Sequence, residues 1–103
     1  MLIDVRPIRD KRRVCLSNEV LSIMGYPDEI FFSICRINDE NHVIMTGNDE
    51  IGERIDKSKV DKAKRIVLTK KVIDELKFND EKFIGFYLMQ INGQEIVSLK
   101  KIA

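Results

Sequence analysis

The sequence contains no tryptophan, one histidine and two cysteines among its 103 residues. A closed zinc site usually needs four ligands, mostly sulfur or imidazole, so Cys15, Cys35 and His42 are too few to form one. In a chain with so few cysteines, and none of them closely spaced, we expect two free, buried thiols. The sequence therefore predicts neither a bound metal nor another cofactor.

Long apolar stretches are also missing. No run reaches the ~18 residues that span a membrane, and the opening MLIDVRPIRDKRR lacks the apolar segment and cleavage site of a secretory signal. The sequence has no phosphate-cradling glycine loop, no nucleophile elbow and no paired histidines. These absences predict a cytoplasmic protein that is not an enzyme.

What the chain does contain is an internal repeat. Residues 13–31 and 65–83 align without a gap at a shift of 52 positions, and twelve of the nineteen positions are identical or similar. The identical pairs are Arg13/Arg65, Leu16/Leu68, Val20/Val72, Asp28/Asp80, Glu29/Glu81 and Phe31/Phe83. Two copies are too few for a solenoid, which needs ~3 or more. The repeat instead predicts one domain, residues 1–103, in which two pseudo-twofold halves bury each other's surfaces.

Each copy has the same predicted order of strand, short helix and hairpin. Ser17 and Thr69 stand where an N-cap belongs, and they precede helices predicted over 18–24 and 70–76. Gly25 suits a left-handed helix stop, whereas its counterpart is Lys77, so the second helix must end differently or at some cost.

The hairpins follow the helices. Apolar runs lead to the polar tips NDEN and NGQE, and Asn92-Gly93 is the strongest hairpin dipeptide in the chain. Acid pairs precede both hairpins, and these fit turn residues better than cation ligands. We predict a first unit over 5–46, a linker over 47–57 and a second unit over 58–101.

Charge is unevenly distributed although the chain has a net charge of only +1. Segments 4–13 and 54–71 together hold thirteen basic and four acidic residues, a sum of +9, while the remainder sums to −8. Each predicted unit thus opens with a basic cluster. Such a cluster favours binding to phosphates, with a plain solvated surface as the alternative.

The two copies, VRPIRDKRRVCLSNEVLSIMGYPDEIFF and KVDKAKRIVLTKKVIDELKFNDEKF, resemble the AbrB-like (SpoVT-AbrB) swapped-hairpin family over nearly the whole chain. The resemblance implies a mainly β fold, a small swapped-hairpin barrel built here from two tandem β-α-β-β units. Many members of that family regulate transcription in prokaryotes. The glycine that usually precedes the arginine is replaced by Arg12 and Lys64, and the usual helix-start proline by Ser17 and Thr69.

The resemblance implies DNA contacts for Arg6, Arg13, Lys59 and Arg65. Neighbouring charges in this sequence extend the predicted set, and they are Arg9, Lys11, Arg12, Lys62 and Lys64. The first helix lacks the arginines that DNA-binding relatives often carry there, and Asp74 in the second helix would repel a phosphate.

The predicted partner is double-stranded DNA. The strand aromatics Phe31, Phe32, Phe83, Phe86 and Tyr87 fit core packing, and the basic clusters hold no aromatic on which single-stranded bases would stack. The alternative function is a protein-binding module of the same fold, antitoxin-like or a phage or plasmid accessory protein. Both a monomeric pseudo-dimer and a swapped homodimer are compatible with the repeat.

Overall fold

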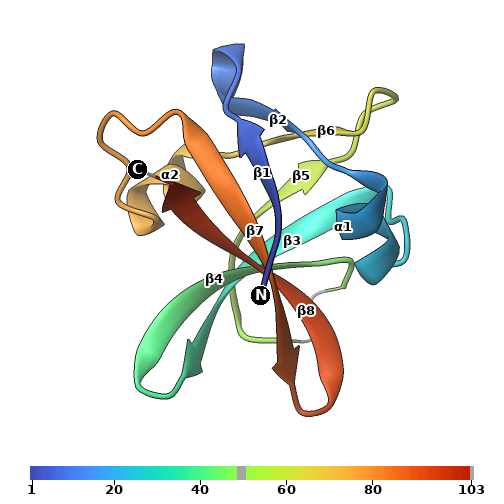
Figure 1. Cartoon of the computed structure of the whole chain (residues 1–103), viewed down its shortest axis with the longest axis vertical. Helices are drawn as coiled ribbons and strands as arrows, with labels where there is room; N and C mark the ends of the chain where they lie inside the picture. The colour runs from blue at the N-terminus through green and yellow to red at the C-terminus, as the bar shows by residue number, and fades with distance from the viewer. Residues whose placement is uncertain (49–50, 103) are drawn as a thin grey trace.

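The protein is mainly β, with eight strands and two short helices in the computed structural model, which describes residues 1–48 and 51–102 (Figure 1). The first unit contains β1 (Leu2–Pro7), the 3-10 turn η1 (Asp10–Arg12), β2 (Arg13–Cys15), α1 (Asn18–Ile23), β3 (Glu29–Ile37) and β4 (Glu40–Thr46). The second unit contains β5 (Glu53–Lys59), β6 (Arg65–Val67), α2 (Lys70–Glu75), β7 (Phe83–Ile91) and β8 (Gln94–Ile102). Asp49 and Glu50 of the predicted linker, and Ala103 at the end of the predicted domain, lie outside the described residues. Neither described helix has the length and apolar character needed to cross a membrane.

The two units interleave in the sheets. A six-stranded antiparallel sheet has the order β1-β7-β8-β4-β3-β5, and β2 pairs with β6 in a separate two-stranded sheet. The first strand of each unit therefore pairs with the hairpin of the other unit, because β1 lies against β7 and β5 lies against β3. Figure 1 shows both hairpins reaching to the bottom of the molecule, with β2 and β6 crossing at the top and a helix on each flank.

One core is shared by both units. Val14 of β2 and Ile66 of β6 are almost fully buried and face the same cluster as Phe32 and Phe86 of the hairpins. Val20 and Val72, one from each helix, are also fully buried in this cluster. Neither unit can keep these side chains from water without the other, so we expect the chain to fold as one unit.

The two helices begin and end close to where the sequence predicts. The Ser17 hydroxyl accepts a hydrogen bond of 3.2 Å from the Val20 N–H, which confirms the predicted N-cap. Thr69 occupies the same place before α2 but makes no capping hydrogen bond. After the helices, Gly25 and Lys77 both adopt the left-handed conformation, with φ of 78° and 57°. Lys77 therefore takes up a strained conformation that glycine adopts freely.

Strands β1 and β5 are elements that the sequence analysis did not predict. Residues 53–57 of the predicted linker belong to β5, and β1 begins before the predicted start of the first unit. Both are edge strands of the six-stranded sheet, with one side unpaired and a face open to water. Their sequences, LIDVRP and ERIDKSK, therefore carry charges and a proline instead of a clear apolar alternation.

The gapless alignment of the repeat is wrong beyond the helices. Seven residues separate α2 from β7, whereas five separate α1 from β3. The helices therefore correspond at a shift of 52 and the hairpins at a shift of 54. Pairing confirms this shift, because Glu29 lies opposite Lys59 while Phe83 lies opposite Pro7. In this register Phe32 corresponds to Phe86, and Phe31 does not correspond to Phe83. The burial agrees, because Phe32 and Phe86 are both fully buried.

The predicted hairpin tips are confirmed as tight turns. The two central residues of each turn have positive φ, namely Asn38 and Asp39 in the first hairpin and Asn92 and Gly93 in the second. This is the geometry of a type I′ turn, which matches the right-handed twist of the flanking strands.

Two expectations about burial are wrong. Cys15 is exposed and Cys35 is only half-buried, although both thiols are free as expected. The reason is the strand period of two, which turns Val14 of β2 into the core and the neighbouring Cys15 outward. Among the aromatics, Phe32 and Phe86 are fully buried, but Phe83 is 46% exposed at the start of β7.

Candidate nucleic-acid interface

A cleft of about 670 Å³ opens beside β1, β2 and β6, and four of the nine predicted DNA-contacting residues line it. These four are the arginines Arg6, Arg9, Arg13 and Arg65. The other lining residues are Pro7, Ile8, Asp10 and Cys15. The cleft thus gathers guanidinium groups that are up to 59 positions apart in the sequence, from Arg6 to Arg65. In Figure 1 these strands meet at the top, away from the hairpin tips.

A tight reversal of the chain places Arg9 beside Arg13. The Arg9 N–H donates to the Arg13 carbonyl at 2.8 Å, and the two residues form an isolated antiparallel bridge. The intervening turn η1 is narrow because Lys11 and Arg12 both have positive φ, at 59° and 57°. The residues RDKRR therefore form a tight basic turn and not an extended strand.

Arg65 reaches the cleft from the second unit. In the β2–β6 ladder, Arg65 lies opposite Cys15. Its guanidinium is fixed by Asp61, with 2.9 Å between Arg65 Nε and Asp61 Oδ2. The Asp61 carboxylate also accepts the backbone N–H of Arg65 and of Ala63, both at 2.9 Å. The loop ahead of β6 is thus folded around a single carboxylate, and the Arg65 N–H is the main cause that lowers the pKa of Asp61.

The four arginines differ in how much of their charge is neutralised. Arg6 is paired with Asp4 at 2.7 Å, just as Arg65 is paired with Asp61. Within residues 1–48 and 51–102, Arg9 and Arg13 have no carboxylate partner, and Arg13 Nε donates only to the Asp10 carbonyl at 3.4 Å. Arg9 and Arg13 are therefore the cations best available to an incoming phosphate.

Arg12 and Lys64 are committed to contacts between the two units. Arg12 Nε donates to the Leu68 carbonyl at 3.0 Å, and Lys64 Nζ donates to the Asn18 side-chain oxygen at 2.6 Å. The two residues are equivalent in the repeat, and both have a left-handed backbone, with φ of 57° and 61°. Glycine adopts that conformation more easily than arginine or lysine does.

The remaining three predicted residues do not line the cleft. Lys11, Lys59 and Lys62 are exposed. Lys11 lies in η1, Lys59 ends β5, and Lys62 lies in the loop before β6. In the part of the chain that the structure describes, no side-chain hydrogen bond or ion pair holds any of the three, so they are free to adjust to a ligand.

The sequence analysis missed the acidic residues of this region. Asp4 and Asp61 each fix one arginine, and Asp10 lines the cleft itself. The spacing of Asp61 and Arg65, four residues apart, was a signal for such a pair, although no helix connects them. No three or more His, Cys, Asp or Glu side chains come together as a metal site in residues 1–48 and 51–102.

Comparison of the chain with models of known protein families, with curated proteins and with solved structures yields no match.

Proposed function

We propose that the protein binds double-stranded DNA through this cleft and acts as a regulator of transcription. The observation that carries the proposal is the convergence of Arg6, Arg9, Arg13 and Arg65, from both units, on one cleft. Counterion release favours the binding of such a cluster to the phosphates of a duplex. Arginine forks also fit guanine edges in the major groove, so the same groups can read bases.

The interleaved strand order supports the further proposal that the chain is a single-chain form of the AbrB-like swapped-hairpin barrel. Each unit lends its first strand to the other unit's hairpin, as β1 pairs with β7 and β5 with β3. A two-unit chain then presents both basic segments on one side, as a dimer of single units would. The two basic segments are not equivalent at the cleft, since Asp61 stands at the position equivalent to Arg9.

The experiment is fluorescence anisotropy with a labelled A·T-rich duplex over a salt series. We expect the affinity to fall steeply with salt, and the Arg9→Gln, Arg13→Gln double variant to lower the slope by about 1.8, or about 0.9 for each lost phosphate contact. The matched control is Arg36→Gln with Lys100→Gln, which removes the same charge from the two hairpins.

Two outcomes would reject the proposal. One is an absence of binding at low salt. The other is an equal loss of slope in the cleft variant and the hairpin variant, which would mean that net charge alone is responsible. Thermal melting of each variant checks that the fold is intact.

The second candidate, a protein-binding module, is favoured by one observation. The edge strand β1 is unpaired on one side and carries the exposed side chains of Leu2 (48%) and Val5 (39%), next to Phe83 (46%) on β7. An edge of this kind accepts an added strand from another polypeptide. Light scattering of the purified chain tests the simplest case, since self-pairing of β1 would give a dimer that Val5→Lys disrupts.

A further inference from the structure

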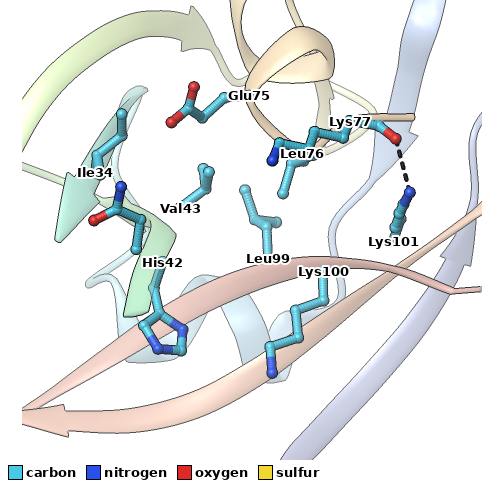
Figure 2. A pocket seen from close by; sticks show the side chains of 10 residues that line it. Ile34, His42, Val43, Glu75, Leu76, Lys77, Leu99, Lys100 and Lys101 are labelled. Carbon is cyan, nitrogen blue, oxygen red and sulfur yellow. Dashed lines mark hydrogen bonds between the residues drawn. The ribbon is translucent and has the colours of Figure 1, made fainter. Parts of the chain in front are cut away.

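A second pocket, of about 410 Å³, lies beside α2 and differs from the arginine cleft in how its charges are arranged (Figure 2). In Figure 2 the side chains of His42 and Lys100 point away from the apolar floor of this pocket. Lys101 lies 3.7 Å from Glu81, between Nζ and Oε1, and its Nζ donates to the Lys77 carbonyl at 2.7 Å. These side chains are thus turned away or paired, whereas two arginines of the cleft present donors in a fixed direction.

Arg6 and Arg65 are held in the cleft by the same arrangement of hydrogen bonds. Arg6 Nε donates to Asp4 Oδ2 at 2.7 Å, and Arg65 Nε donates to Asp61 Oδ2 at 2.9 Å. The second oxygen of each carboxylate binds the backbone. Asp4 Oδ1 accepts the Val5 N–H, and Asp61 Oδ1 accepts the Arg65 N–H, both at 2.9 Å. Each carboxylate therefore connects a guanidinium to the backbone and fixes its orientation.

The terminal nitrogens of both guanidinium groups point to no acceptor of the protein. Within residues 1–48 and 51–102, the side-chain hydrogen bonds of Arg6 and Arg65 use Nε alone. The two side chains are 38% and 42% exposed, so a ligand in the cleft can reach them. Because Nε is occupied, Nη1 and Nη2 form the outer edge of a planar fork of N–H donors.

A guanidinium that is paired with a carboxylate suits a base edge better than a phosphate. The carboxylate cancels most of the positive charge, so a phosphate contact by Arg6 or Arg65 would gain little from counterion release. Guanine presents two neutral acceptors, O6 and N7, in the major groove, and two parallel N–H groups of one arginine bind both. Such a contact depends on the orientation of the fork more than on net charge.

The repeat contains a matched arginine that lacks this support. Arg13 is equivalent to Arg65, but Arg9 stands where the second unit has Asp61. Arg13 Nε donates to the Asp10 carbonyl at 3.4 Å, which is a long hydrogen bond. Arg13 therefore keeps its full charge and its freedom to adjust, and both properties suit a phosphate contact.

The support of Arg6 is likewise present in one unit only. The carboxylate is repeated by Asp56 of β5, whose Oδ1 accepts the next backbone N–H at 2.9 Å. At the position of Arg6, however, the second unit has Ser58, whose hydroxyl accepts the Val67 N–H at 2.9 Å. Each unit therefore contributes one supported arginine to the cleft, Arg6 from β1 and Arg65 from β6.

We propose that the two arginines paired with carboxylates, Arg6 and Arg65, read guanine bases of the bound duplex. Asp4 and Asp61 act through them as positioning residues. The two unpaired arginines of the cleft bind phosphates and supply most of the affinity. This inference rests on the proposed function, because it concerns a duplex bound in the same cleft.

The test is a selection by the full chain from a pool of duplexes about 20 base pairs long, roughly two helical turns, with random interior sequence. Sequencing of the bound duplexes gives the base preference, and anisotropy with the unselected pool gives the overall affinity. We expect guanine to be enriched at two positions of the bound duplexes. Arg6→Lys and Arg65→Lys keep the charge but remove the fork, so each should lower the guanine preference at one position about tenfold.

The matched control is Arg9→Lys with Arg13→Lys, at the two unpaired arginines. This double variant also exchanges guanidinium for ammonium groups, and it should leave the guanine preference unchanged because lysine binds phosphates as a point charge.

Asp4→Asn and Asp61→Asn separate positioning from a purely structural role. Asparagine keeps an oxygen that can accept the backbone N–H, but it has no charge with which to hold a guanidinium. Each variant should lose the guanine preference at the position read by its arginine. Its affinity for the unselected pool should rise about twofold, because one negative charge has left the cleft. A carboxylate with a structural role alone would change the affinity and leave the preference of the bound fraction as it is.

Three outcomes would overturn the inference while DNA binding persists. The first is a wild-type protein that binds the pool without a preference for guanine. The second is a control variant that loses as much preference as Arg6→Lys and Arg65→Lys do. The third is an unchanged preference in Asp4→Asn and Asp61→Asn. Absence of binding to the pool at low salt would instead reject the proposed function, and this inference with it.

Discussion

The two units differ most where each short helix meets the sheet. In the first unit, Gly25 ends the helix without strain, and Gly47 lets β4 pack against the end of α1. In the second unit, Lys77 and Lys101 stand at these positions, and a pocket of about 410 Å³ remains open. The same fold therefore tolerates a nearly closed junction in one unit and an open junction in the other.

A second difference between the units lies in the turns that precede β2 and β6. Arg9 leads into the turn before β2, while Asp61 holds the equivalent place before β6 and neutralises Arg65. The basic cleft is therefore uneven, with free cations from the first unit and a paired one from the second. The first unit thus contributes the unpaired arginines of the cleft, and the more open pocket lies beside the helix of the second unit.

The largest expected effect tests whether the two units share one core. Phe32→Ala and Phe86→Ala each remove a fully buried equivalent ring, and each should lower the free energy of unfolding by about 3–5 kcal/mol. Both variants should unfold in a single transition in urea, followed by circular dichroism. Phe83→Ala, at a ring that is 46% exposed, should cost less than about 1.5 kcal/mol. Two separate transitions would show that the units fold independently.

Substitutions at the ends of the two helices should change the stability of the protein in opposite directions. Gly25→Ala forces a side chain into the left-handed region and should destabilise the protein by about 1 kcal/mol, whereas Lys77→Gly should stabilise it by up to about 1 kcal/mol. Thermal melting of the two variants gives the comparison. A destabilising Lys77→Gly would mean that the Lys77 side chain contributes more to packing than its backbone conformation costs.

The hairpin tips offer a smaller contrast of the same kind. Asp39 and Gly93 occupy the same left-handed turn position, with φ of 64° and 79°. Asp39→Gly should raise the free energy of unfolding by about 0.5 kcal/mol, and Gly93→Asp should lower it by a similar amount. Equal and opposite shifts in the urea midpoint are the expected result, and shifts of the same sign would contradict the equivalence of the two turns.

The smallest effect concerns acid stability. The pKa of Asp61 is lowered from its ordinary value of 3.8 in the folded protein, chiefly by the Arg65 N–H and then by the guanidinium. The ionised carboxylate therefore stabilises the fold above about pH 4, and this contribution is lost as the pH falls through the lower folded pKa. When the pH is lowered from 6 to 3, the melting temperature of Asp61→Asn should fall less than that of the wild type. An equal loss in both proteins would assign the acid sensitivity to other carboxylates.

Local signals in the sequence were sufficient for the helices and the turns. Ser17 caps α1 as its chemistry predicts, and Asn92-Gly93 forms the expected tight turn. The edge strands β1 and β5 escaped prediction because strands with one open side need no apolar alternation. The two extra residues after α2 escaped it because an alignment of identical letters, such as Phe31 with Phe83, carries no information about pairing.

The candidate site, too, was predictable from the sequence only in part. A concentration of basic residues was visible in the sequence, but not which of them lie together. The convergence of Arg65 with Arg9 and Arg13 depends on the β2–β6 ladder between the units, a long-range contact. The commitment of Arg12 and Lys64 to contacts across the units is likewise a consequence of tertiary structure. The pocket beside α2 likewise depends on tertiary structure, because residues of both units line it.

The most direct measurement is the mapping of a duplex of about 20 base pairs, roughly two helical turns, onto the ¹⁵N-labelled protein by amide chemical shifts. The account predicts shifts concentrated in residues 6–13 and 60–65, larger in the first segment, with the hairpin tips at 38–41 and 92–95 unaffected. Shifts centred on the hairpin tips, or none at all, would contradict it.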